Sequence, residues 1–330
     1  MAPAQPYPYG YPSPGPDAGA LTVVPAVPPL PSHIWSVAVD ALFLERSSGG
    51  SLPLGYTYWN SPSLQTRDDL YSDDSPFPLV AGLRLELSGK LDNDITLAGT
   101  YWGLQQWSVG DTIYGDPSQD TVLAYSPYLQ LPALLYGLDN SLGYTYNSQI
   151  ENVEFNALFR LNGYDPYWQL SWLLGARYVY FADQFTLTGI DTLNSATEQL
   201  ASNTANNLVG AQTGLLLLYG WSHFQWEVGM KLGLMANIYR QHMTDTASEP
   251  SGTPAGFNPY DITNSGCGLS GLFELSLAAR IRLSENLWLR LGYQFYDIGG
   301  LATGPRQLDG WGHGANLALD GFSIGLQATW

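Results

Sequence analysis

The chain has 330 residues, with 12 Lys and Arg against 29 Asp and Glu, which gives a formal net charge of −17. Only 12% of the residues are charged, whereas 45% are hydrophobic and 13% aromatic. This composition excludes a disordered acidic tail and argues against nucleic-acid binding, which needs a basic surface. No apolar run approaches the ~20 residues of a membrane-spanning helix. The single cysteine, Cys267, excludes an intramolecular disulfide and a cysteine-based zinc site.

Residues 1–32 are rich in Pro and Tyr. Such Pro density blocks helices and central strands and favours extended polyproline II, so we expect a disordered linker. A Pro-rich ligand for a partner or a cell-wall spacer is the alternative. The start has neither a basic region nor an apolar core of a signal peptide. Either the protein is not exported, or its signal lies upstream and has been removed.

From residue 33 to residue 330 the sequence alternates with a period of two, which predicts one β domain. In 150–161, Val153, Phe155 and Ala157 share one face, and Glu154 and Arg160 share the other. Most of the candidate strands have 10–17 residues, the length that tilted strands need to cross a bilayer. The ten predicted strands cover residues 34–46, 78–87, 95–107, 150–161, 167–185, 206–219, 224–240, 267–283, 287–297 and 317–330.

The connections between these strands alternate between long and short. The long ones cover 47–77, 108–149, 186–205, 241–266 and 298–316, and the short ones 88–94, 162–166, 220–223 and 284–286. Outer-membrane barrels have long external loops and short periplasmic turns. The pattern predicts an all-β, transmembrane up-and-down antiparallel barrel of about ten strands, with the N- and C-termini in the periplasm of a bacterial outer membrane.

Charged residues within the strands fall opposite the apolar face. A charge that faces lipid at mid-depth costs ~2–4 kcal/mol, so these side chains are expected in the lumen. A water-soluble sandwich would give a similar charge pattern, but it would not need a long exposed face of Trp, Leu and Tyr. The charged residues predicted to face the lumen are Arg84, Glu86, Glu154, Arg160, Arg177, Glu227, Lys231, Glu274, Arg280, Arg282 and Arg290.

Aromatic residues cluster near the predicted strand ends, where amphipathic rings prefer the membrane interface. This set includes Trp102 and Trp107. The last strand ends on an aromatic residue after alternating apolar positions, which is typical of the signal read by the barrel assembly machinery. The residues of this predicted assembly signal are Phe322, Ile324, Leu326, Ala328 and Trp330.

Four segments carry a family resemblance: GARYVYFADQFTL (175–187), NNLVGAQTGLLL (206–217), LWLRLGYQFYDIGGLATGP (287–305) and LDGFSIGLQATW at the C-terminus. They resemble the β-barrel porin family of bacterial outer membranes, over roughly 34–330. The resemblance implies an outer-membrane barrel inserted by the assembly machinery and surrounded by lipid. It brings no catalytic residues.

Other motifs predict no site. The GxGxxG match at 266–271 is followed by an alternating strand, whereas a dinucleotide site needs a helix there. The Asp pairs at 68–69 and 73–74 are expected to be solvated loop charge, with Ca²⁺ binding as the alternative. His242 and His313, with Asp245 and Asp309 nearby, could form an Asp/His pair as in omptin proteases, but the surrounding sequence does not resemble theirs.

We therefore expect no enzyme, cofactor or metal, and no nucleic-acid partner. Ten strands enclose little more than side chains, and Leu173, Phe181, Trp288 and Tyr296 add bulk to the wall. A largely filled lumen predicts a structural or surface-binding role through acidic external loops. A narrow cation-preferring pore is the alternative, and an omptin-like surface enzyme is third. The sequence does not reveal the solute, the ligand or the oligomeric state.

Overall fold

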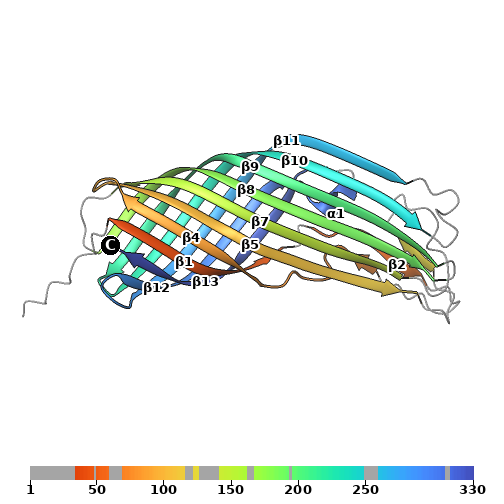
Figure 1. The fold of residues 1–330 in the computed structure, drawn as a ribbon, viewed down its shortest axis with the longest axis horizontal. Helices are drawn as coiled ribbons and strands as arrows, with labels where there is room; N and C mark the ends of the chain where they lie inside the picture. Colours follow the sequence, from red (N-terminus) through yellow and green to blue (C-terminus); the bar gives the residue numbers. More distant parts are fainter. Residues whose placement is uncertain are drawn as a thin grey trace, which may run out of the picture.

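The computed structural model describes residues 34–47, 50–58, 69–115, 122–125, 141–161, 167–192, 195–248, 259–308 and 313–330. They form one closed antiparallel barrel of ten strands (Figure 1), which confirms the predicted fold class. The barrel strands are β1 (Trp35–Arg46), β4 (Val80–Lys90), β5 (Ile95–Tyr114), β7 (Ser141–Arg160), β8 (Trp168–Asp191), β9 (Ala196–Trp221), β10 (Phe224–Ser248), β11 (Tyr260–Arg282), β12 (Leu287–Leu301) and β13 (Ala315–Thr329).

Neighbouring barrel strands pair in chain order, and β1 closes the cylinder by pairing with both β4 and β13. A small second sheet, β3-β2-β6, is formed by β2 (Pro53–Tyr58), β3 (Asp69–Tyr71) and β6 (Val122–Tyr125). The one helix among the described residues, α1 (Gly304–Leu308), lies between β12 and β13. No helix in the described part of the chain is long and apolar enough to cross a membrane.

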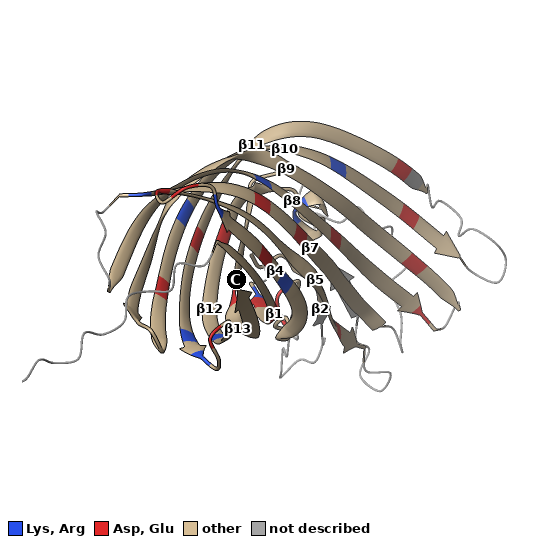
Figure 2. Ribbon diagram, turned by 60° about the vertical axis from the view of Figure 1, so that its left-hand side comes forward, with Lys and Arg blue, Asp and Glu red and all other residues tan. Residues whose placement is uncertain are grey.

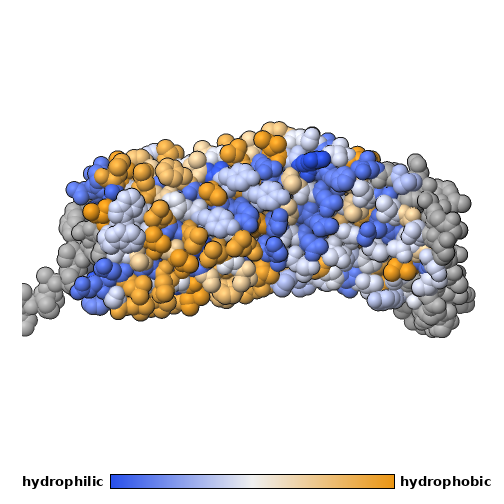
Figure 3. Space-filling model, viewed as in Figure 1, coloured by the Kyte–Doolittle hydropathy of each residue, from blue (hydrophilic) through white to orange (hydrophobic). Residues whose placement is uncertain are grey.

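The polarity of the wall inverts along the barrel axis. On β8 the outward residues from Trp168 to Tyr178 are apolar or aromatic, whereas Gln184, Thr186 and Thr188 follow beyond them. Figure 3 shows this change as an apolar half at the end that carries the termini and a polar half beyond it. Thirteen residues from Trp168 to Tyr180, rising ~3.3 Å each at a tilt of ~40°, span about 30 Å, close to the apolar band of outer-membrane barrels.

Nine of the ten barrel strands are longer than predicted, with up to 26 residues in β9. The predicted long loop at 186–205 is therefore wrong, because β8 continues to Asp191 and β9 begins at Ala196. Parts of the predicted loops at 108–149 and 241–266 are also strand. The prediction ended each strand where its apolar outer face ended, but beyond that point the wall stays paired and turns its polar residues outward.

A β-bulge in β5 also changes what the sequence predicted. The register shifts between Gly103 and Gln105, and Leu104 has a φ of 69°. The extra residue inverts the alternation, so that Trp102 and Trp107 both point inward and are 1% exposed. Their predicted place at the membrane interface is therefore wrong.

The polar half of the barrel has an apolar interior. Leu142, Phe181 and Phe185 from the wall pack there in one cluster with Leu54 and Leu70 of the small sheet. The outer surface of this half is polar and its interior apolar, as in a water-soluble barrel. The lumen is thus filled at this level by side chains of the wall and of the β1–β4 connection.

The connection that follows β12 is held inside the barrel by Asn206 of β9. Asn206 Nδ2 donates to the Ala302 carbonyl oxygen at 2.8 Å, and Asn206 Oδ1 accepts from the Ala302 amide at 2.8 Å. Ser202 Oγ donates to the Gly304 carbonyl oxygen at 3.0 Å. Leu301 and Leu308 join the apolar cluster, so this connection closes the interior rather than leaving it open.

Candidate functional site

The interior of the apolar-walled half is crossed by a network of buried charges. Arg177 of β8 places Nη2 2.8 Å from Glu154 Oε1 of β7 and 2.8 Å from Glu274 Oε2 of β11. Lys231 of β10 places Nζ 2.7 Å from Glu154 and 2.9 Å from Glu274. Two cations and two carboxylates from four strands thus form a closed, charge-balanced ring, which we call the lumen ring.

Amide side chains add hydrogen bonds to this ring. Arg177 Nε donates to Asn152 Oδ1 at 2.6 Å, and Arg177 Nη1 donates to Gln212 Oε1 at 3.1 Å. Gln212 Nε2 donates to Glu154 Oε2 at 3.0 Å. Buried charges are stable only when they are paired and hydrogen-bonded. Every charge of the ring is paired, and Glu274 Oε2 has its ion pair with Arg177 but no hydrogen bond.

A second network surrounds Arg290 of β12. Arg290 Nη1 lies 3.2 Å from Glu86 Oε2 of β4 and 3.8 Å from Asp40 Oδ2 of β1. Arg84 pairs with the same Glu86 at 3.6 Å, and Arg280 pairs with Glu227 of β10. Figure 2 shows Lys and Arg interspersed with Asp and Glu in the half of the barrel nearer the termini. Strands that are not neighbours in the wall, such as β12 and β4, are thereby joined through the lumen.

Two of the eleven predicted lumen residues stand apart from these networks. Arg160, the last residue of β7, hydrogen-bonds Gln169 of β8 at the end of the barrel that carries the termini. Arg282 donates from Nε to the Ser284 carbonyl oxygen at 3.0 Å and from Nη2 to that of Glu285 at 3.0 Å. Arg282 therefore caps a turn, and the other nine form ion pairs inside the barrel.

A vestibule of about 200 Å³ opens between these networks and the terminal end of the barrel. Its lining includes Trp35, Lys90, Glu86, Glu227 and Arg280. These last three residues belong to the second network. A solute that enters from this end meets paired charges before it reaches the lumen ring.

A further buried ion pair lies in the apolar interior, and sequence reasoning missed it. Arg46 Nη1 lies 3.0 Å from Asp183 Oδ1, and both side chains are fully buried. The Arg46 guanidinium stacks 4.2 Å from the ring centroid of Phe77. Asp183 shares the inward alternation of Arg177 on β8, so the period-two pattern could have found it.

Two carboxyl groups meet on the inner wall far from the termini. Glu198 of β9 and Asp245 of β10 are 3% and 2% exposed. Burial and the neighbouring Asp245 carboxylate raise the pKa of Glu198 to about 8. Burial raises the pKa of Asp245 to about 6. The pair therefore retains a proton near neutral pH.

The suggested Asp/His pair is not assembled among the described residues. His242 faces outward, with Nε2 2.7 Å from Asp261 Oδ1 of β11, whereas Asp245 faces inward three residues later. His313 packs edge-on against Tyr239 at 5.5 Å, and Asp309 lies outside the described residues. No group of three or more His, Cys, Asp or Glu that could hold a metal ion occurs in the described part of the chain.

The acidic loop residues are only partly described. Asp74 Oδ2 accepts a hydrogen bond from the Tyr71 amide at 2.6 Å, which is a turn-stabilising role. Asp68, Asp116, Asp120 and Asp139 lie outside the described residues, as does the linker at 1–32. At the C-terminus, Phe322, Ile324, Leu326 and Trp330 are exposed on the outer face and Ala328 is half-buried.

The comparisons with known proteins address the architecture. The structure is similar to the outer membrane protease OmpT from Escherichia coli, with 10% identity, a TM-score of 0.52, and coverage of 90% of this chain and 97% of that one. A FadL homologue from Pseudomonas aeruginosa has 9% identity, a TM-score of 0.23 and 90% coverage of each chain. The toluene transporter TodX from Pseudomonas putida has 7% identity, a TM-score of 0.22 and coverage of 91% and 90%.

No protein-family description and no curated protein matches the sequence. Membership of the β-barrel porin family therefore stays a prediction. TM-scores of 0.23 and 0.22 carry no argument about this chain. The likeness to OmpT, at 10% identity, establishes the fold alone. The chain has the closed antiparallel architecture of outer-membrane β-barrel proteins.

Proposed function

We propose that the chain is an integral barrel of a bacterial outer membrane with a sealed lumen, and that it acts at the cell surface by binding or as a structural element. The observation that carries the proposal is the lumen ring. Side chains of β7, β8, β10 and β11 meet across the interior there, and Arg177 and Glu154 are each 2% exposed. The apolar cluster fills the next level of the same interior.

The orientation follows from the two ends of the barrel. Both described termini lie at the end with the apolar wall, where Trp330 and Trp35 share backbone hydrogen bonds at 3.0 Å. The polar-walled half then projects outward from the cell. The termini are periplasmic in this orientation, and the C-terminal strand faces lipid with the residues of the predicted assembly signal. The proposal includes no catalytic function.

A narrow cation-preferring pore is the second candidate, and the vestibule favours it. Its lining balances Glu86 and Glu227 against Lys90 and Arg280, so a cation preference would come from the net charge of −17 of the chain. For conduction, the lumen ring would have to dissociate and the apolar cluster would have to part. Both steps expose buried groups at a cost of several kcal/mol.

The deciding experiment is conductance of the purified full chain in a planar lipid bilayer. A sealed lumen predicts no steps above the background of the empty bilayer. Small cation-selective steps would replace the proposal with the pore. Large, stable, anion-selective steps would contradict both the sealed lumen and the cation preference of the alternative pore.

A further inference from the structure

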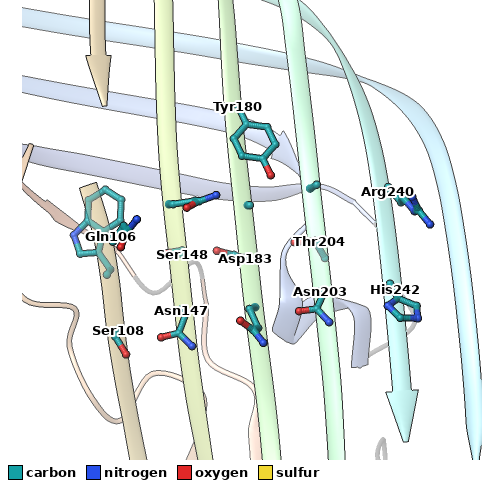
Figure 4. Close-up of a pocket in the computed structure, with 15 residues that line it drawn as sticks. Gln106, Ser108, Asn147, Ser148, Tyr180, Asp183, Asn203, Thr204, Arg240 and His242 are labelled. Carbon is teal, nitrogen blue, oxygen red and sulfur yellow. The ribbon is translucent and has the colours of Figure 1, made fainter. Parts of the chain in front are cut away.

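The outer wall of the barrel carries a depression of about 660 Å³, which spans the five neighbouring strands β5, β7, β8, β9 and β10. We call it the outer groove. Figure 4 shows side chains of these strands along it, with Arg240 and His242 on β10 at one side and Gln106 and Ser108 on β5 at the other. Its volume lies within the ~300–1,000 Å³ of small-ligand sites.

Strand register creates the floor of the groove. Arg240 pairs with Ala205, Ala205 with Ala182, and Ala182 with Gln149, so these four residues form one row across four strands. Two methyl groups therefore occupy the middle of a row whose ends carry long side chains. The small residues leave a hollow in a wall that is otherwise covered by larger groups.

The next row supplies hydrogen-bonding groups. Asn203 pairs with Gln184, and Gln184 pairs with Asn147. Each amide offers two donor hydrogens and one acceptor oxygen. The side chains of these three residues make no hydrogen bond to any other described residue. A ligand with several hydroxyl groups would find partners along the whole row.

The groove lies at the edge of the apolar wall. Tyr180 borders it on the side towards the termini. The outward row beyond Tyr180 contains Tyr178, Val209 and Val153, which are 39%, 53% and 49% exposed and begin the apolar band. In a bilayer that covers this band, the groove opens among the lipid headgroups rather than the acyl chains.

Arg240 supplies a cation at the β10 side of the groove, in an otherwise acidic protein. Arg240 is exposed and makes no ion pair with any described residue. His242 lies in the next row, two residues further along β10, and is held by Asp261 at 2.7 Å. A guanidinium binds phosphate through two parallel hydrogen bonds. Arg240 is therefore placed to bind a phosphate at the β10 end of the floor row, beside the row of amides.

We propose that the outer groove binds the phosphorylated sugar headgroup of a glycolipid in the outer leaflet of the membrane. Arg240 binds its phosphate, and Asn203, Gln184 and Asn147 bind its hydroxyl groups. A simple phospholipid fits less well, because its single phosphate would leave the amide row unused. This inference rests on the proposed membrane location, and it names the class of ligand that the outer groove binds.

The test uses native mass spectrometry of the full chain in detergent, titrated with lipid A, a phosphorylated disaccharide lipid. Phosphatidylglycerol serves as an anionic lipid without sugar. Ala182→Trp fills the floor, and Arg240→Gln removes the phosphate partner; each should weaken lipid A binding by about tenfold or more. Ala318→Trp on β13, across the barrel, and Arg306→Gln in α1 are matched controls and should leave binding unchanged.

Equal lipid A affinity in all four variants, or equal affinity for phosphatidylglycerol, would overturn the proposal. Binding of the deacylated saccharide without binding of the intact lipid would also overturn it, because the ligand would then be a soluble sugar phosphate. Conductance of the same preparation separates this result from the sealed lumen. A conducting barrel that still binds lipid A contradicts only the proposed function, and a silent barrel that does not bind it contradicts only the groove.

Discussion

Replacing Arg177 with methionine should destabilise the barrel strongly. Arg177→Met removes one of the two cations of the lumen ring, which leaves Glu154 and Glu274 to share Lys231. Breaking a buried ion pair by removing one partner costs ~3–5 kcal/mol. For the 243 residues that the structure describes, an unfolding entropy of ~2.1 cal/mol/K per residue converts this cost into a fall in Tm of about 6–10 °C.

We expect Arg177→Met to lower the stability through the loss of charge balance rather than through the loss of packing. Arg177→Met combined with Glu274→Gln leaves one cation and one carboxylate, Lys231 and Glu154, which are 2.7 Å apart. This double variant should therefore recover more than half of the lost Tm. The assay is thermal unfolding in detergent, followed by tryptophan fluorescence. Arg306→Gln, an exposed position, should change stability by no more than ~0.5 kcal/mol.

Two results would refute this reasoning. One is a Tm for Arg177→Met within about 1 °C of the original chain, since the cited cost predicts several degrees. The other is a double variant less stable than the single one, which would show that Glu274 contributes independently of its cation. Either outcome would also weaken the argument that the ring seals the lumen.

Three further predictions concern other parts of the barrel. The pKa values of Glu198 and Asp245 are raised to about 8 and about 6, so the folded chain holds more protons than the unfolded chain between about pH 4 and pH 8. The Tm should therefore fall as the pH rises through this window. Glu198→Gln should flatten this pH dependence of the Tm. Gly321→Ala would press a methyl group against the β1 backbone, whereas the space at Gly271 is open. In the same unfolding assay, Gly321→Ala should lower the free energy of unfolding by ~1–3 kcal/mol. Gly271→Ala should lower it clearly less. Protease added to whole cells should cut within 249–258 and spare the turn at 283–286, and the reverse pattern would invert the proposed orientation.

The sequence predicted the apolar-walled half of the barrel well because one physical rule governs it. A strand in lipid must place apolar residues outward, so Phe155 and Leu174 mark the outer face and Glu154 and Arg177 mark the inner one. The same rule places Phe322 and Ile324 outward on β13. Ion-pair partners, however, depend on which strands face each other across the lumen, and alternation along one strand does not contain that information.

The polar-walled half followed a different rule, which is why its strands were taken for loops. At Gln184 and Thr186 the outer face becomes polar, while Phe185 and Leu187 turn inward. Inward and outward positions still alternate, but here the polar residues face outward and the apolar residues face inward. The bulge at Leu104 is harder to foresee, because one residue with a positive φ redirects Trp107 and nothing in the neighbouring residues demands it.

The inversion also bears on where the barrel can act. A strand of 26 residues, rising ~3.4 Å each at a tilt of ~40°, spans about 65 Å, roughly twice the apolar band. A membrane anchor alone would not need the second half, and a water-filled pore would not fill its interior with Phe181, Phe185 and Leu200. What this half adds is a rigid outer surface rich in amides and threonines, with the outer groove where it meets the bilayer. Binding on that outer surface is therefore the activity that we propose for the inverted wall.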